Sequence, residues 1–327
     1  MSRPHMLAGR SRKLGPGAEF DRIRRVMQLL GAQGVGLGDD CGLIREGEEF
    51  FALSTDVSVE GIHFRPQWIR PEEVGWRATA SALSDLAAEG AVPVGILSAV
   101  TMPARAPEAH LLELMSGVGA AAKYAGTQVL GGDISTGPAW SVAITVVGRT
   151  RAPVTRGGAE PGDRLWVSGT LGGARAALEA WRRGEAPLPG ARVRFAHPEP
   201  RIAAGRWLAR HGAHAMIDLS DGLGGDAGHL AAASEASLEI DLDAVPVAPE
   251  VAPEAERLGL AAQQFAAEGG EDFELLVALP PRFDAAAAFG RECGIGLTPI
   301  GAVGEGSGVR FLLDGREISL KGFDHFG

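Results

Sequence analysis

The chain has only two cysteines, one tyrosine and no long apolar run. Cys41 and Cys293 lie far apart, so they form neither a disulfide framework nor a zinc motif, and they fit a reducing compartment. No apolar run reaches the roughly 18 residues that a membrane span needs. The basic N-terminus also lacks the apolar core of a signal peptide. We therefore expect a cytoplasmic protein with no membrane partner.

Positive charge is also scarce. The chain has 31 Lys and Arg against 41 Asp and Glu, which gives a net charge of -10. A nucleic-acid-binding protein needs a basic face, so this balance argues against nucleic acid as a partner. An anionic substrate remains possible if bound metal ions supply the positive charge.

The common nucleotide-binding motifs are missing. There is no phosphate-binding G-x-x-x-x-G-K-[ST] segment, and the glycines of 34–38 do not have the dinucleotide-binding spacing. The calcium-loop pattern is absent as well. A nucleotide would therefore have to be held by another arrangement.

What the chain does have is a set of short acidic segments rich in Gly, Ser and Thr. Alone, each is typical of a turn or a helix cap. One Mg²⁺ usually takes one or two protein carboxylates, so converging segments could hold several ions and hence a polyphosphate, with ATP as the first hypothesis. The segments are Gly38-Asp39-Asp40, Ser54-Thr55-Asp56, Ser84-Asp85-Leu86, Gly131-Gly132-Asp133, Asp218-Leu219-Ser220-Asp221-Gly222 and Gly269-Gly270-Glu271-Asp272.

Three of these segments point to a site by their local chemistry. Asp39 and Asp40 are adjacent like charges, which repel unless a cation or solvent relieves them. Asp56 is expected at the C-terminal end of a strand. Asp218 follows apolar residues within an expected strand, and a buried charge needs a partner. Asp221 lies across the following strand-to-helix corner, where a phosphate would meet a helix N-terminus.

Four other residues have both a structural and a functional interpretation. Arg156 is either a surface residue of a hinge or a phosphate clamp between domains. His63 is either structural or a substrate contact. Phe323 either docks the C-terminal segment or stacks on a heteroaromatic ligand, and Tyr124 is expected to pack on a helix face.

Helical and strand patterns alternate along the chain, which predicts two α/β or α+β domains. We expect a disordered tail over 1–18, a first domain over 19–150 and a second over 151–327, with a hinge rich in Gly and Pro at 149–163. The expected helices are 19–30, 71–89, 107–125, 172–183, 200–211 and 223–234. The expected strands are 50–54, 94–101, 140–148, 165–168, 214–219, 238–242, 273–279 and 309–313.

Taken in order, these segments resemble the thiamine-monophosphate kinase family of the aminoimidazole ribonucleotide synthetase-like superfamily. The resemblance covers nearly all of the chain after about residue 15. Ser54-Thr55-Asp56 with Gly61-Ile62-His63-Phe64, and the terminal Gly322-Phe323-Asp324-His325-Phe326, favour this family over its relatives. The other matching pieces are 36–41, 83–88, 131–133, 155–163, 217–223 and 269–273.

The resemblance implies a two-domain synthetase-like fold, in which the N-terminal sheet joins that of a partner in a homodimer. It implies direct transfer of the ATP γ-phosphoryl group to thiamine phosphate, with several Mg²⁺ ions and with Asp56, Asp85 and Asp218 at the centre of the chemistry. The implied Mg²⁺ ligands are Asp40, Ser54, Thr55, Asp56, Asp85, Asp133, Asp218 and Asp221. The implied ATP contacts are Tyr124, Gly132, Asp133, Arg156 and Ser220, and the implied thiamine phosphate contacts are His63, Glu271 and Phe323.

The chain departs from the family pattern at three positions. Ile134 replaces a common Thr, Glu89 a common Met, and Gly42 a common Ala. None of these removes an implied metal ligand. Two alternatives remain: another ATP-dependent synthetase of the superfamily, acting on an aminoimidazole ribonucleotide or selenide, and a non-catalytic module that binds metal or nucleotide.

Overall fold

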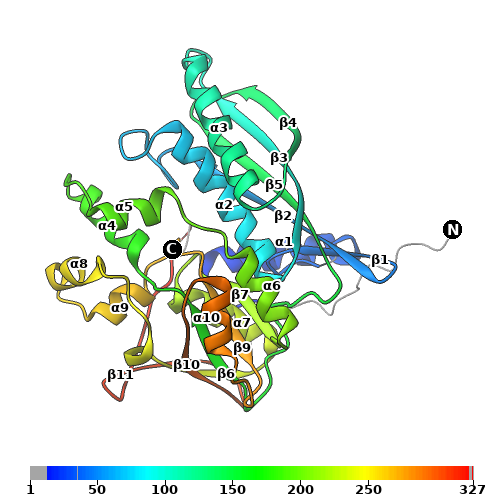
Figure 1. The fold of residues 1–327 in the computed structure, drawn as a ribbon, viewed down its shortest axis with the longest axis vertical. Helices are drawn as coiled ribbons and strands as arrows, with labels where there is room; N and C mark the ends of the chain where they lie inside the picture. The colour runs from blue at the N-terminus through cyan, green and yellow to red at the C-terminus, as the bar shows by residue number, and fades with distance from the viewer. Residues whose placement is uncertain (1–12, 35, 324–325, 327) are drawn as a thin grey trace.

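The computed structural model describes residues 13–34, 36–323 and 326. Among these residues the strands form a five-stranded and a seven-stranded sheet, which lie in the upper and lower halves of Figure 1. The helices are α1 (Ala18–Leu30), η1 (Gly31–Gln33), α2 (Pro71–Ala88), α3 (Glu108–Tyr124), α4 (Gly173–Arg182), α5 (Pro189–Ala196), α6 (Ile202–Arg210), α7 (Leu223–Ser234), η2 (Leu242–Ala244), α8 (Val251–Leu258), α9 (Ala262–Ala267) and α10 (Ala286–Cys293).

The strands of the first sheet lie in the order β1-β2-β5-β3-β4, all antiparallel except β3 and β4. The second sheet has the order β12-β11-β8-β10-β6-β9-β7. The strands are β1 (Gly42–Glu46), β2 (Glu49–Val59), β3 (Val92–Met102), β4 (Val129–Thr136), β5 (Ser141–Thr150), β6 (Arg164–Ser168), β7 (Ala215–Asp218), β8 (Ser237–Asp241), β9 (Leu275–Leu279), β10 (Leu297–Gly304), β11 (Gly308–Leu313) and β12 (Arg316–Ile318).

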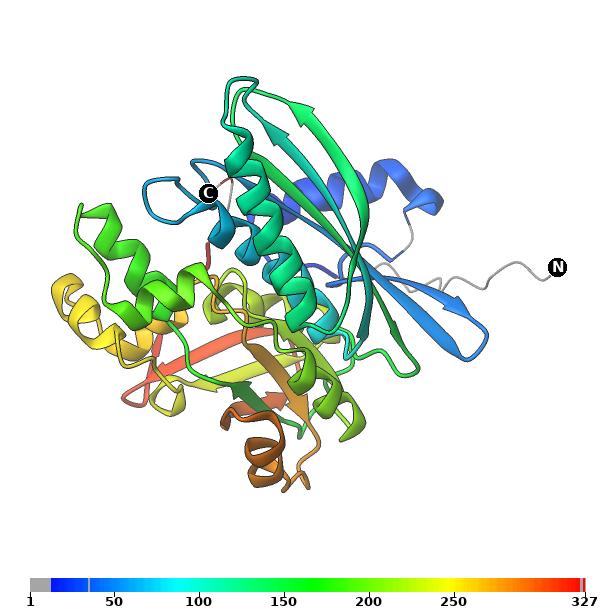
Figure 2. The same ribbon diagram turned by 45° about the horizontal axis from the view of Figure 1, so that its top comes forward.

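One face of the first sheet is covered by α2 and α3 (Figure 2), and on the other face Val57 and Leu97 are exposed. Val142, Ile144 and Val146 of β5 are buried under the helices, whereas the residues between them are more exposed. This alternation follows from the two-residue period of a strand. It defines a helix-covered face and an open face, and every residue of the sheet can be assigned to one of them from the register.

Helix α2 holds the two halves of the molecule together. It begins at Pro71, where the Arg70 N–H donates to the Glu73 carboxylate at 2.8 Å, and it ends before Gly90, whose φ is 65°. Glu73 also accepts two hydrogen bonds of 2.8 Å from Arg192 of α5. At the other end, a Cβ on Gly205 of α6 would lie 1.9 Å from the Ala87 carbonyl oxygen. This close helix contact keeps the end of α2 beside the second sheet.

The structure confirms most of the expected elements but moves two acidic segments from loops into strands. Thr55 and Asp56 lie in the middle of the eleven-residue β2, because the strand continues past the expected end at residue 54. The Gly131-Gly132-Asp133 segment is part of β4, which pairs with β3 over its length. The sequence patterns also missed β1, α5, α8, α9, α10, β10 and β12.

The expected tail over 1–18 is wrong for its last residues, and residues 1–12 lie outside the described residues. Lys13 forms an ion pair of 3.1 Å with Glu235, and Arg24 donates hydrogen bonds to the carbonyl oxygens of Leu14 and Gly15. The Phe20 ring lies on the ring of His229, with centroids 3.7 Å apart. These contacts attach the N-terminal segment to α7. Within the part of the chain that the structure describes, no helix is long and apolar enough to cross a membrane.

Candidate active site

Three carboxylates from separate parts of the chain meet between the two sheets. Asp40 precedes β1, Asp85 lies near the end of α2, and Asp218 ends β7. Each offers an oxygen that lies within 4.8 Å of the others. The sequence prediction that these acidic segments converge is therefore confirmed for the three, and we name Asp40, Asp85 and Asp218 the acid cluster.

The acid cluster has the electrostatics of an enclosed group of like charges. Burial raises the pKa of Asp218 to about 8, and the charge of Asp40 adds to this effect. The pKa of Asp85 is raised well above its usual value by burial and then by Asp56 and Asp218. Like charges in a low-dielectric pocket favour protonation unless positive charge is supplied. The cluster thus needs a cation to hold all its carboxylates ionised.

Arg156 provides part of that charge. Its side chain is largely buried. It donates two hydrogen bonds to Asp40 Oδ1, from Nε at 3.0 Å and from Nη2 at 2.5 Å. Its backbone N–H donates to Asp39 Oδ1 at 2.9 Å. Although burial opposes the charged form, Asp40 more than offsets it and raises the pKa of Arg156. The surface interpretation of Arg156 is therefore wrong, because the hinge loop folds back onto the cluster.

The residues of the cluster fit a divalent cation. Both hydrogen bonds from Arg156 reach Oδ1 of Asp40, and Oδ2 of the same carboxylate is buried without a hydrogen-bond partner. A buried carboxylate oxygen is costly to leave unsatisfied. Carboxylate oxygens are the ligands that Mg²⁺ prefers in proteins. The donor set and the unsatisfied oxygen together suit an oxygen-binding metal ion.

Ser54 and Asp56 face the cluster from β2, but Thr55 does not. Ser54 Oγ donates to Asp85 Oδ2 at 2.5 Å, which brings β2 against α2. The pKa of Asp56 is raised by burial, although a hydrogen bond from Ser81 and the charge of His63 oppose the shift. Thr55 lies on the open face, where its Oγ1 is 2.8 Å from Oγ1 of Thr145. The hydroxyl of Thr55 is therefore not placed among the expected metal ligands.

Gly132 and Asp133 lie on β4, at the far edge of the first sheet from β2. Asp133 pairs with Ala99, which pairs with Ala143 and through it with Val57, so Asp133 is on the open face. Three strand spacings separate β4 from β2, which amounts to about 14 Å. A Cβ on Gly132 would lie 1.7 Å from the Ser98 carbonyl oxygen, which explains the glycine. Within one chain these residues are remote from Asp56.

A second group of predicted residues surrounds the turn that follows β7. The Glu271 N–H donates to the Ser220 carbonyl oxygen at 2.7 Å, and the Phe323 N–H donates to that of Asp221 at 2.9 Å. Glu271 has a φ of 67°, a strained conformation for a residue other than glycine. Its carboxylate forms an ion pair with the buried Arg77 of α2. The turn, the 269–273 loop and the C-terminal segment thus form one connected wall beside Asp218.

The remaining predicted residues, His63 and Tyr124, belong to the first half of the chain. His63 follows β2, and its Nδ1 accepts a hydrogen bond of 3.1 Å from the Val59 N–H. Because Nδ1 is the acceptor, the neutral ring carries its proton on Nε2. Tyr124 ends α3 and packs edge-on against Trp76, with ring centroids 5.5 Å apart, while half of its surface stays exposed. Tyr124 therefore packs against a neighbouring helix but, contrary to the expectation from the sequence, does not lie in the core.

Sequence reasoning missed two residues that support the site. Asp226 lies in the first turn of α7, and its carboxylate accepts the Asp221 N–H at 3.1 Å. Its pKa is raised well above the usual value by burial and then by Asp221 and Asp218. Arg77 of α2 is the second residue, and it supports the site through its ion pair with Glu271. Asp226 lies five residues after Asp221, so an acid near a helix start could have drawn attention to it, whereas nothing in the sequence distinguishes Arg77.

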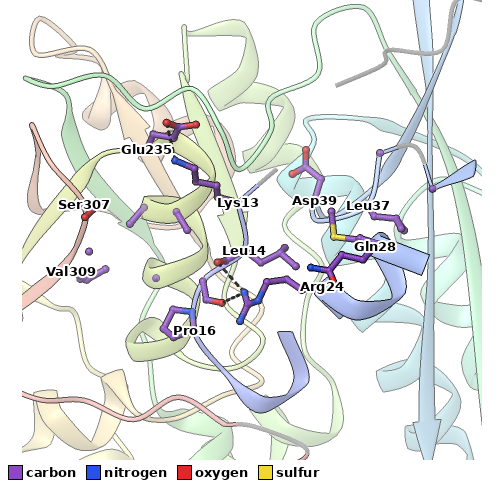
Figure 3. Close-up of a pocket in the computed structure, with 18 of the residues that line it drawn as sticks. Lys13, Leu14, Pro16, Arg24, Gln28, Leu37, Asp39, Glu235, Ser307 and Val309 are labelled. Atoms are coloured by element: carbon purple, nitrogen blue, oxygen red, sulfur yellow. Dashed lines mark hydrogen bonds and ion pairs between the residues drawn. The ribbon is translucent and has the colours of Figure 1, made fainter. Parts of the chain in front are cut away.

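A cavity of about 1400 Å³ adjoins the acid cluster, and Asp39, Cys41 and Gly224 form part of its wall. Figure 3 shows Arg24, Gln28 and Leu37 along one side of it and Lys13 with Glu235 along another. Burial raises the pKa of the Cys41 thiol, and the charges of Glu89 and Asp85 add to the shift. Such a thiol is a poor nucleophile. The carboxylates, and not the cysteine, are therefore the chemical groups of this region.

Comparison with known proteins identifies the family of this chain. Residues 38–150 match the model of the AIR synthase related protein N-terminal domain, and residues 160–314 match that of its C-terminal domain. The thiamine-monophosphate kinase of Haemophilus influenzae is 36% identical over 94% of this chain and 98% of its own length. The chain belongs to the thiamine-monophosphate kinase family. The matches in both halves of the chain confirm the resemblance and the two-domain synthetase-like α/β fold.

The solved structures agree with this assignment. AaThiL complexed with AMPPCP and TMP has a TM-score of 0.85 and 33% identity, covering 95% of this chain and 97% of that one. The hydrogenase maturation protein HypE in complex with ATP has a TM-score of 0.70 at 20% identity, covering 84% of this chain and 85% of that one, which shows a shared fold. Of these two structures, AaThiL is the more similar to this chain.

Proposed function

We propose that this protein is an ATP-dependent kinase that transfers the γ-phosphoryl group of ATP to thiamine monophosphate, giving thiamine diphosphate and ADP. The family membership over nearly the full length supports the reaction. The single structural observation that supports it best is the acid cluster with Arg156 bound to Asp40. Phosphoryl transfer depends on positioning and charge neutralisation, and this region has the groups for both.

We propose that Asp40, Asp56, Asp85 and Asp218 hold more than one Mg²⁺ ion, with Asp221 beside them. The unsatisfied Oδ2 of Asp40 and the raised pKa values of its neighbours support this. Bound Mg²⁺ would neutralise phosphate charge, so that two anionic reactants can approach. Arg156 donates two hydrogen bonds to Asp40 and so orients that carboxylate. Ser220 and the start of α7 would receive a phosphate of ATP, because the N–H groups of a helix N-terminus favour anions.

The acceptor would lie along the wall formed by the 269–273 loop and the C-terminal segment. His63 would donate a hydrogen bond from Nε2, and Arg77 would keep Glu271 in place. Phe323 is half exposed on this wall, so its ring can stack on an aromatic ligand. We expect Phe323→Ala to raise KM for thiamine monophosphate about tenfold by removing a stacking contact, with KM for ATP unchanged. An unchanged KM for thiamine monophosphate would rule out the stacking role.

We further propose a homodimer formed through the first sheet. Leu97 of β3 and Leu130 and Ile134 of β4 are exposed large apolar residues, and every residue of β4 is exposed. An exposed apolar edge strand is a site of pairing with another chain. Gly132, Asp133 and Tyr124 keep their proposed ATP-binding roles in this arrangement. The dimer would bring Asp133 of one subunit toward the acid cluster of the other, since the two are remote within one chain.

Two other expectations are kept as proposals. The domain boundary at residue 150 agrees with the end of β5 and with the change of sheet after it. A cytoplasmic location is supported by two cysteines that are both free. Neither is needed for the proposed reaction.

The reaction is tested by ADP release from the purified protein with ATP and Mg²⁺, with and without thiamine monophosphate. We expect release that depends on thiamine monophosphate, and a product with the mass of thiamine diphosphate. ADP release only with another acceptor would reassign the protein to another synthetase of its superfamily. ATP binding with no acceptor-dependent release would identify a non-catalytic module.

A further inference from the structure

Strand β2 and helix α2 exchange two hydrogen bonds beside the acid cluster. Ser54 of β2 donates from Oγ to Asp85 Oδ2 of α2 at 2.5 Å. Ser81 of α2 donates from Oγ to Asp56 Oδ2 of β2 at 2.6 Å. Each element therefore supplies one serine and one aspartate, and each serine binds the aspartate of the other element. We name these four residues the serine–aspartate exchange.

The spacing of the four residues makes the exchange possible. Ser54 and Asp56 are two apart on a strand, so both project from the helix-covered face. Ser81 and Asp85 are four apart on a helix, so they lie one above the other on the side that faces the sheet. The distance along the strand is about 6.6 Å and that along the helix is about 6 Å, which are nearly equal. The two pairs can therefore form at once between antiparallel elements.

The exchange limits how the two carboxylates can turn. Rotation about the Cβ–Cγ bond of Asp is broad, so a carboxylate without partners would sample many orientations. A serine bound to Oδ2 removes that freedom and leaves Oδ1 in a set direction. The serines thus act on the direction of their aspartates.

We propose that Ser81 is a positioning residue that fixes the carboxylate of Asp56 for binding a divalent cation, and that Ser54 acts in the same way on Asp85. This proposal rests on the proposed function, since it concerns the same metal site. It changes the expected role of Ser54, whose hydroxyl is a donor to Asp85 and acts through that carboxylate. Ser81 belongs to none of the segments that first pointed to the site.

The chain offers a matched control for Ser81 two residues away. Thr79 lies on the same helix and is fully buried, and its Oγ1 donates to the Gly75 carbonyl oxygen at 2.9 Å. Thr79→Val removes this hydroxyl with little change of shape and does not touch the exchange. Ser81→Ala removes the bond to Asp56, whereas Ser81→Thr retains a hydroxyl and serves as the rescue variant. Ser81→Cys keeps the shape with a weaker donor, in case Ser81→Ala does not fold.

The test is a titration of the full-length protein with Mn²⁺, followed by electron paramagnetic resonance, without nucleotide or thiamine monophosphate. Removing a group that orients a metal ligand weakens metal binding about 10- to 100-fold, so Ser81→Ala should weaken it at least tenfold. Ser81→Thr should restore most of the affinity, and Thr79→Val should bind as the wild type does. Because the readout is metal binding, it does not depend on which acceptor the enzyme phosphorylates.

Three outcomes would overturn the proposal. The first is wild-type Mn²⁺ affinity in folded Ser81→Ala, or in Ser81→Cys if the alanine variant does not fold. The second is an equal loss of affinity in Thr79→Val, which would indicate a general effect of hydroxyls in α2. The third is the absence of Mn²⁺ binding by the wild-type protein, which would remove the cation site on which the proposal depends. Failure of the kinase assay with normal Mn²⁺ results would instead reject only the proposed acceptor.

Discussion

Asp56 and Thr55 are neighbours on β2, yet their side chains project from opposite faces of the first sheet. Asp56 lies under α2, bound to Ser81 and close enough to Asp85 for their charges to interact. Thr55 lies on the open face, bound to Thr145 of the next strand. The same segment thus faces the acid cluster on one side of the sheet and an exposed surface on the other. The alternation of a strand, and not the identity of the residues, separates the two roles.

The same division applies to the other end of the sheet. Asp85 is held on the helix-covered side, whereas Asp133 lies on the open face of an exposed edge strand. The pKa of Asp85 is raised by burial and by Asp56, which indicates a carboxylate inside a group of like charges. A carboxylate on the open face needs a partner from outside the chain to enter such a group. The comparison therefore separates a carboxylate enclosed within the chain from one on an exposed edge strand.

The largest expected effect is that of removing a charge from the helix-covered face. We expect Asp56→Asn to lower kcat on the order of 10³-fold, because a neutral amide gives up the charge that the proposed metal site needs. Without Mg²⁺ the variant should unfold at a denaturant concentration no lower than the wild type, since one of several buried like charges is gone. Enzyme kinetics and chemical denaturation check both expectations. Near-normal kcat in the folded variant would reject the role of Asp56.

The second prediction asks whether Asp133 acts across a dimer. Asp133→Asn and Asp56→Asn should each be nearly inactive alone. If the site of one subunit uses Asp133 of the other, a 1:1 mixture refolded together should regain about a quarter of the wild-type activity, because half of the dimers are mixed and each has one intact site. The specific activity of the mixture measures this. A mixture as inactive as its components would place Asp133 and Asp56 in the same subunit's site.

A smaller effect is expected from the two hydroxyls of β2. Ser54→Ala should lower kcat about tenfold, because Asp85 loses the hydrogen bond that orients it. Thr55→Val should stay within about twofold of the wild type, because its bond to Thr145 is a surface contact of small net strength. Parallel kinetics of the two variants at saturating Mg²⁺ make the comparison. A larger loss of kcat in Thr55→Val than in Ser54→Ala would show that the hydroxyl on the open face contributes more to turnover than the one on the helix-covered face.

The sequence predicted which acidic segments matter but not how they are divided between the faces. Asp40, Asp85 and Asp218 were expected to converge, and they do. Thr55 and Asp133 were grouped with them because a motif records residue type and order and does not record which face of a sheet a side chain occupies. Both segments were expected in loops, where a side chain can turn in any direction. In β2 and β4 the register sets that direction.

The residues that bind and orient the carboxylates of the site could also not be predicted from the sequence. Arg156 had both a surface and a phosphate-clamp interpretation, and only the folded chain shows it bound to Asp40 across 116 positions. The bond from Ser81 to Asp56 likewise depends on how α2 lies across β2. Helix boundaries were easier, since Pro71 and Gly90 mark the ends of α2 by local backbone chemistry. Local signals thus gave the elements, whereas long-range packing decided the partners.

The smallest effect on turnover is expected for His229, a buried histidine of α7. Burial lowers the pKa of His229 to about 3, helped by the charges of Arg156 and Arg24. The folded state therefore prefers the neutral ring, so the stabilisation is complete above an unfolded pKa near 6.5 and is lost as the pH falls from there toward 3. At pH 5 the loss should be about 2 kcal/mol of the free energy of unfolding.

Replacing the histidine isolates this contribution from those of the acid cluster. His229→Gln has no group that titrates in this range, so the free energy of unfolding of the wild type relative to the variant should fall by that amount between pH 7 and pH 5. Urea denaturation at both pH values measures the difference. At pH 7 the kcat of the variant should stay within about twofold of the wild type, since the ring contacts Phe20 and not the cluster. A difference in stability that does not change with pH would show that His229 is not held neutral, and that the N-terminal segment is attached to α7 by contacts other than this ring.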